Sequence, residues 1–131
     1  MSPFEELGHP ADLCLRIWGQ DLGQLFADAA RGMFHLMRCS RSEKGRPVSH
    51  RVVLDSYDLE ALLVDWLNEL LYLSEADEEL YHSYSIVHLE PGHLEAVVQG
   101  KTECPCERGI KATTFSGLEV IRTEIGYEAT I

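Results

Sequence analysis

No apolar run in this sequence approaches the roughly 18 residues that suggest a membrane-spanning helix. The first residues, Ser2 to Glu6, do not form a basic stretch followed by an apolar one, so no secretion leader is indicated. A length of 131 residues with 45% hydrophobic content suits one globular domain, covering residues 1–131. We therefore expect a cytoplasmic single-domain protein.

Positive charge is scarce. The chain has 11 lysines and arginines against 22 aspartates and glutamates, which gives a net charge of -11. A field of this sign repels phosphate backbones, so tight direct binding of RNA or DNA is disfavoured. A cation or a basic protein partner suits it better. One basic cluster lies between Arg38 and Arg46, and we interpret it as a solvated loop.

Cysteines are few and poorly spaced for zinc. They are Cys14, Cys39, Cys104 and Cys106. One residue separates the last two, whereas paired zinc ligands are usually separated by about two to four residues. Without a secretion signal, a disulfide framework is not expected either. We therefore predict free thiols in a loop.

Recognisable catalytic motifs are also missing. The sequence contains no Gly-x-Ser-x-Gly elbow, no signature that pairs a nucleophilic cysteine with histidine, and no glycine-rich phosphate loop. The six histidines are scattered. His88 and His93 flank a predicted hairpin turn at Glu90 to His93, and we interpret them as a surface pair rather than a metal site.

The strongest pattern in the sequence is helical and covers residues 58–73. Leucines recur there at i, i+3, i+4 and i+7 spacing, and Asp58 can cap the first turn. So broad an apolar stripe needs a large partner surface, for which a β-sheet is the natural candidate. Asp65, Glu69 and Tyr72 share one edge of this helix. That edge is either a solvated flank or an acidic docking surface.

A second helix is predicted after Asp21, where Gln24 follows at capping-box spacing. Alternating or turn-bounded segments predict strands near residues 4–9, 13–18, 48–54, 81–89, 94–98, 110–115, 118–125 and 127–131. Two helices with seven or eight strands favour an α+β domain with a mostly antiparallel or mixed sheet. We expect both helices to pack on one face of that sheet.

The short stretch His9-Pro-Ala-Asp12 brings an imidazole and a carboxylate to a predicted strand-to-strand corner. Asp12 can act as a hard oxygen ligand for Ca²⁺ or Mg²⁺. On spacing alone, the preferred interpretation is that it bonds its own backbone in an Asx turn. One carboxylate does not complete a calcium site, which takes about six to eight oxygens.

Four stretches together resemble the archease family and occur in that family's order. They are His9 to Asp12, Leu25 to Phe34, Asp58 to Tyr72, and Ile110-Lys-Ala-Thr-Thr-Phe-Ser-Gly-Leu-Glu-Val120. The resemblance implies a small cytoplasmic partner protein, not an enzyme, for the tRNA-splicing RNA ligase that joins 2′,3′-cyclic-phosphate and 5′-hydroxyl ends. Such proteins promote guanylylation of the ligase and its multiple turnover.

The resemblance also implies a bound divalent cation. Ca²⁺ is the first expectation, with Mg²⁺ and Mn²⁺ as alternatives, and Asp12 matches a metal ligand of the family. The family's other ligands are an aspartate and the last residue at the C-terminus. This sequence ends at Ile131, a few residues short of that pattern, so we assign Asp12 alone. The Cys104-Pro-Cys106 stretch also replaces a more acidic, histidine-containing one.

Two other functions compete with ligase activation. A small metal-dependent hydrolase would use Asp12 as ligand and His9 as base, and would need about two or three more convergent ionisable groups. An RNA-binding chaperone is the third hypothesis, and the negative charge argues against it. A turnover assay with the ligase separates the first hypothesis from the others, and salt-titrated RNA binding tests the third.

Overall fold

The computed structural model describes residues 4–7, 14–41, 43–106, 120–123 and 126–130. These residues form two helices and seven strands, which confirms the α+β class. The elements in chain order are β1 (Phe4–Leu7), β2 (Cys14–Gly19), α1 (Leu22–Leu36), β3 (Pro47–Asp55), α2 (Leu59–Glu75), β4 (Leu80–Glu90), β5 (His93–Lys101), β6 (Val120–Thr123) and β7 (Gly126–Thr130). The strand predicted near residues 110–115 lies outside the described residues.

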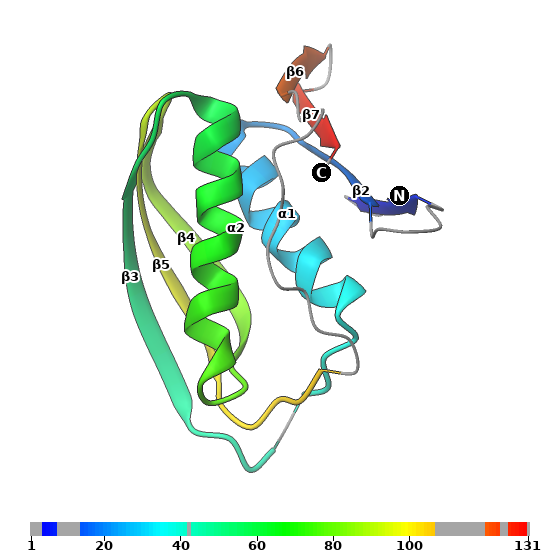
Figure 1. The fold of residues 1–131 in the computed structure, drawn as a ribbon, viewed down its shortest axis with the longest axis vertical. Coiled ribbons are helices and arrows are strands. Elements are labelled where there is room, and N and C mark those ends of the chain that lie inside the picture. Colours follow the sequence, from blue (N-terminus) through cyan, green and yellow to red (C-terminus); the bar gives the residue numbers. More distant parts are fainter. Residues whose placement is uncertain (1–3, 8–13, 42, 107–119, 124–125, 131) are drawn as a thin grey trace.

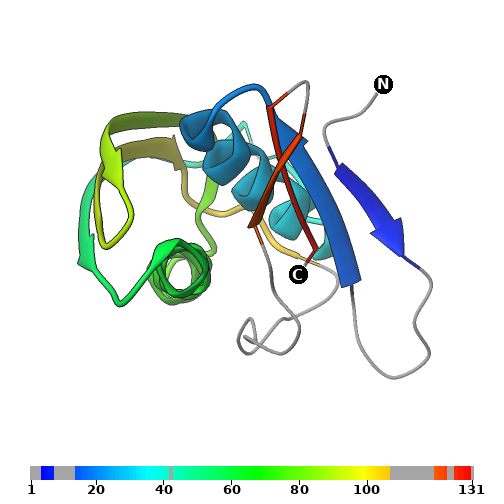
Figure 2. The same ribbon diagram turned by 90° about the horizontal axis from the view of Figure 1, so that it is seen from above.

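Within the described part of the chain, the strands form two antiparallel sheets, where the sequence suggested one. Their orders are β3-β5-β4 and β1-β2-β7-β6. Helix α1 lies between the two sheets and contacts β4 on one side and β1, β2 and β7 on the other (Figures 1 and 2). The second sheet is explained by the burial of α1. Most residues of this helix are buried, so its apolar side chains must be covered on two sides.

Both helices pack on one face of the β3-β5-β4 sheet, as predicted. Helix α2 contacts β3, and α1 contacts β4 (Figure 2). On the central strand β5, Leu94, Ala96 and Val98 point to this face and are fully buried. The alternate residues of the sheet point outward, where Val53 is 50% exposed on β3. The sheet therefore has one face in the core and one in solvent.

The helix starts follow the sequence prediction with one difference. The carboxylate of Asp58 accepts a hydrogen bond from the Ala61 N–H at 2.9 Å, and Asp21 accepts one from the Gln24 N–H at 2.8 Å. A complete capping box would also turn the Gln24 side chain back to the cap. Instead, its amide donates to Asp28 at 2.9 Å, so only the N-cap half of the motif forms.

The two helices are joined through a fully buried tryptophan. Trp66 of α2 donates its indole N–H to the backbone carbonyl of Phe26 in α1 at 2.9 Å. The predicted turn between β4 and β5 is also present, and Gly92 adopts a φ of 113° there, which favours glycine. Among the described helices, neither is long and apolar enough to cross a membrane.

Candidate functional site

The predicted metal ligand Asp12 and its neighbour His9 lie outside the described residues, so their roles stay predictions. The structure does describe the strands that precede and follow these two residues in the sequence, β1 and β2. Strand β1 ends at Leu7, which pairs with Cys14 at the start of β2. Strand β7 runs antiparallel to β2 and brings Thr130 opposite Arg16 (Figure 2). The end of β7 therefore lies beside Arg16, near the start of β2.

This strand pairing joins two distant parts of the chain, residues 16–19 and 127–130. The resemblance assigns Asp12 alone in this sequence, and β7 is the last strand of the described residues. Among the described residues, no group of three or more His, Cys, Asp or Glu side chains is placed to hold a metal ion.

His88 and His93 meet across the β4–β5 hairpin on the outer face of the sheet, with ring centroids 5.7 Å apart. Both nitrogens of His93 face carboxylates: Nδ1 lies 2.6 Å from Asp55, and Nε2 lies 3.4 Å from Glu95. His88 lies 3.5 Å from Glu90. The predicted surface pair is therefore confirmed, and its imidazoles face carboxylates.

The charges on this outer face shift one another's pKa values. The hydrogen bond that the His93 Nδ1–H donates to Asp55 raises the pKa of His93, and the contact with Glu95 raises it further. Glu95 also accepts a hydrogen bond from Arg51 at 2.9 Å, which, with His93, lowers the pKa of the Glu95 carboxyl. The arrangement favours a protonated His93 held among carboxylates.

A second polar cluster is buried on the core side of the same sheet. It lies at the connection between the end of α2 and the start of β4. The Glu79 carboxylate is 7% exposed and accepts from His50 at 2.6 Å and from the Tyr81 hydroxyl at 2.8 Å. Burial raises the pKa of Tyr81, and the hydrogen bond to Glu79 raises it further, so the phenol stays a donor. This cluster was not predicted from the sequence, because His50 and Glu79 are 29 positions apart and no spacing rule links them.

The predicted edge of α2 lies partly in solvent. Asp65 is exposed and Tyr72 is 72% exposed, whereas Glu69 is half-buried. Glu69 also contributes, after burial and Glu79, to the raised pKa of Tyr81. These exposures agree with a solvated flank, and a docking role for this edge stays a prediction.

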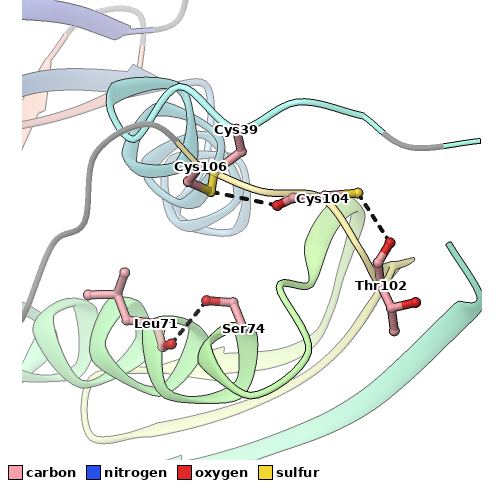
Figure 3. Close-up of a disulfide and its surroundings, with 6 residues drawn as sticks. All are labelled: Cys39, Leu71, Ser74, Thr102, Cys104 and Cys106. Carbon is pink, nitrogen blue, oxygen red and sulfur yellow. Dashed lines mark hydrogen bonds between the residues drawn. A yellow bond between two sulfur atoms is a disulfide. The ribbon is translucent and has the colours of Figure 1, made fainter.

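The prediction of free thiols is wrong for two of the cysteines. Cys39, just after α1, forms a disulfide with Cys106, just after β5 (Figure 3). Cys104 is a free, buried thiol, as predicted. Sequence spacing could not reveal the bond, because 67 positions separate its ends and only tertiary pairing brings them together. The basic cluster beside it is exposed at Arg38, Arg41 and Arg46, as expected for a solvated loop.

Comparison with known proteins decides the family. A family model described as the Archease protein family matches residues 4–131. This chain belongs to the archease family. Protein archease from Methanosarcina barkeri is 34% identical over 98% of this chain and 92% of its own length. Protein archease from Saccharolobus solfataricus is 32% identical over 99% of this chain and 96% of its own.

The archease fold is supported by a solved structure. The solution structure of protein 1598 from Methanobacterium thermoautotrophicum has a TM-score of 0.74 and 28% identity to this chain. That likeness covers 100% of this chain and 97% of the other. The sequence resemblance to archease is therefore confirmed.

Proposed function

We propose that this chain activates the tRNA-splicing RNA ligase, promoting guanylylation of that enzyme and its multiple turnover, and performs no bond chemistry itself. Membership of the archease family over residues 4–131 carries the proposal. The net charge of -11 supports it, since an RNA-binding enzyme offers basic surface and opposite fields speed encounter. The same charge argues against direct binding of the RNA. We place this action in the cytoplasm.

We further propose a divalent cation, with calcium preferred and magnesium or manganese as alternatives, held at Asp12. The pairing of β7 with β2 supports a metal site near Asp12. It brings the end of β7 close to the start of β2, so residues from both ends of the chain could share one site. A bound cation supplies positive charge that can stabilise phosphoryl oxygens near the docked ligase. Asp12 would hold that ion through a carboxylate oxygen.

A reconstituted ligase assay tests both proposals. Purified chain, supplied with Ca²⁺ or Mg²⁺, should raise the number of RNA joints formed per ligase molecule and the rate of ligase guanylylation. The Asp12→Ala variant should lose bound metal and much of this stimulation. Asp55→Ala is the matched control, because Asp55 is an 81% exposed carboxylate on the outer sheet face. Unchanged ligase turnover with wild-type chain would overturn the activator role, and full metal content in Asp12→Ala would overturn the site.

A further inference from the structure

Two segments that are far apart in the sequence lie side by side beyond the end of α1. They are residues 39–41 and 43–46, which follow that helix, and residues 102–106, which follow β5. At one end, the Ser40 N–H donates to the Pro105 carbonyl at 2.9 Å. At the other, Arg46 and Thr102 exchange two hydrogen bonds of 2.9 and 3.0 Å. Hydrogen bonds therefore hold the two segments together at both ends.

The disulfide between Cys39 and Cys106 lies at the first of these ends (Figure 3). Both cysteines are half-buried, packed against the edge of the core rather than inside it. Thiol–disulfide exchange begins when a thiolate reaches one sulfur of the bond. A half-buried disulfide at the core's edge is placed for such an approach, whereas a bond in the centre of the core would be shielded.

The surroundings of Cys106 suit its reduced form as well as its oxidised form. Its Sγ lies 3.9 Å from the Cys104 carbonyl, a contact that only a thiol could use as a donor. The Cys104 thiol points elsewhere and donates to the Thr102 carbonyl at 3.5 Å (Figure 3). Cys104 is therefore turned away from the disulfide, and a reduced Cys106 would find an acceptor already in place.

The fold does not depend on this bond for its core. The buried cluster is built from Phe26, Leu62, Trp66, Leu94 and other apolar side chains of the helices and of β2 to β5. Disulfides are usually essential in small secreted domains that lack such a core. In addition, the hydrogen bonds of Ser40 and Arg46 do not involve sulfur. Breaking the disulfide should therefore leave the domain folded.

The exposed positive charge near Cys39 also attracts an approaching anionic thiolate. Arg38 immediately precedes Cys39, Arg41 lies two positions after it, and both are exposed. They lie in the one basic cluster of a chain whose net charge is -11. Exposed positive charge raises the local concentration of anions and helps thiolates approach.

From these observations, we propose that Cys39–Cys106 is a reversible thiol–disulfide site that takes a small dithiol, or a dithiol protein, as its reductant. A reductant thiolate attacks one sulfur, forms a mixed disulfide and releases the other cysteine as a thiolate that takes up a proton. The second reductant thiol then displaces the attached cysteine, leaving two protein thiols and the reductant as a disulfide. A disulfide oxidant such as oxidised glutathione reverses both steps.

Reduction leaves residues 102–106 without a covalent link to residues 39–41 and 43–46, while the hydrogen bonds of Ser40 and Arg46 remain. The Ser40–Pro105 hydrogen bond, next to the lost cross-link, should then open more often. We expect the Ser40 amide to exchange with solvent about tenfold faster after reduction, while amides in the centre of β5 remain protected. The site would thus set how firmly the segment after β5 is attached to the end of α1.

The direct test is a redox titration of the folded full-length chain. The protein is equilibrated with mixtures of reduced and oxidised dithiothreitol or glutathione, quenched with acid, and labelled with a thiol-reactive maleimide. Peptide mass spectrometry should show Cys39 and Cys106 becoming labelled together on reduction and protected together on reoxidation. Circular dichroism should show a folded chain at both limits. Cys39→Ser and Cys106→Ser should each abolish the transition, and the matched control Cys104→Ala should retain it.

Three outcomes would overturn the proposal. The first is labelling of Cys39 and Cys106 at every redox ratio, which would mean that no bond forms. The second is a bond that resists dithiothreitol until denaturant is added, which would make it a permanent cross-link. The third is loss of the transition in Cys104→Ala, which would mean that a different pair of cysteines is responsible. If the Ser40 amide exchanges with solvent at the same rate before and after reduction, the disulfide does not control how firmly the segment after β5 is attached to α1.

Discussion

At the scale of single residues, Glu79 joins parts of the chain that the sequence keeps apart. Its buried carboxylate accepts from His50 on β3 and from Tyr81 on β4, just beyond the end of α2. A buried donor that loses its acceptor keeps the desolvation cost without the compensating hydrogen bond. This cluster is therefore a structural anchor between helix and sheet.

Replacing Glu79 with alanine should lower the free energy of unfolding by about 2 kcal/mol, because the Tyr81 hydroxyl and the His50 N–H lose their acceptor. Urea unfolding followed by tryptophan fluorescence measures the change. Glu75→Ala is the matched control, since Glu75 is an exposed glutamate at the end of α2, and it should change stability by less than about 0.5 kcal/mol. If Glu79→Ala and Glu75→Ala lower the free energy of unfolding equally, the buried hydrogen bonds of Glu79 contribute nothing to stability.

The pKa of His93 should lie above the ordinary value of about 6.5, because Asp55 and Glu95 favour the protonated ring. Protonated His93 therefore stabilises the folded protein fully at pH values below the ordinary pKa of histidine. This stabilisation is lost as the pH rises through the raised pKa of His93 in the folded protein. Titration of the His93 ring signals by NMR measures the midpoint. Asp55→Asn should move the midpoint down, while Asp65→Asn, on α2, should leave it in place. A His93 midpoint at or below that of an unfolded-chain histidine would contradict this assignment.

At the scale of elements, the contact between α1 and α2 depends on one directed bond inside an apolar interface. Trp66 fills the space between the helices and donates to the carbonyl of Phe26. Each helix start is capped by its own aspartate, Asp21 or Asp58, so local chemistry defines where the helices begin. Their mutual placement depends on the tryptophan and its neighbours.

Trp66→Phe should destabilise the protein by about 2 kcal/mol, since the smaller ring leaves a cavity and the Phe26 carbonyl loses a donor. Circular dichroism during urea unfolding measures this loss without relying on tryptophan emission. Tyr72→Phe, on the exposed edge of the same helix, is the control and should stay within about 0.5 kcal/mol of wild type. If Tyr72→Phe lowered stability and Trp66→Phe did not, the assignment of Trp66 to the buried face of α2 and Tyr72 to the exposed face would be wrong.

At the scale of the whole molecule, the disulfide ties two ends of a long chain segment. It closes a loop with a sequence separation of 67, which spans β3, α2, β4 and β5. A cross-link over such a loop restricts the unfolded chain more than the folded one. It therefore stabilises the domain even though the core does not require it.

Reduction of the wild-type chain should lower the free energy of unfolding by about 4 kcal/mol, from the entropy of the opened loop. Urea unfolding with and without dithiothreitol gives the difference in one protein. Cys106→Ser serves as the control and should unfold at the same urea concentration with or without reductant. If wild type also shows no response, the cross-link does not constrain the unfolded state.

The sequence by itself determined the features that depend on near neighbours. Helical periodicity and the caps at Asp21 and Asp58 marked both helices, alternation marked the strands in the described part of the chain, and four ordered motifs indicated the family. The carboxylate proposed for metal, Asp12, also came from sequence and still rests on that resemblance.

Tertiary structure alone decided which distant segments meet. It separated the strands into two sheets around α1, joined His50 to Glu79, and brought Cys39 to Cys106. The reason is physical: caps and periodicity involve residues within about four positions of one another, whereas these contacts depend on how strands pair and helices pack. No local pattern in the sequence carries that information.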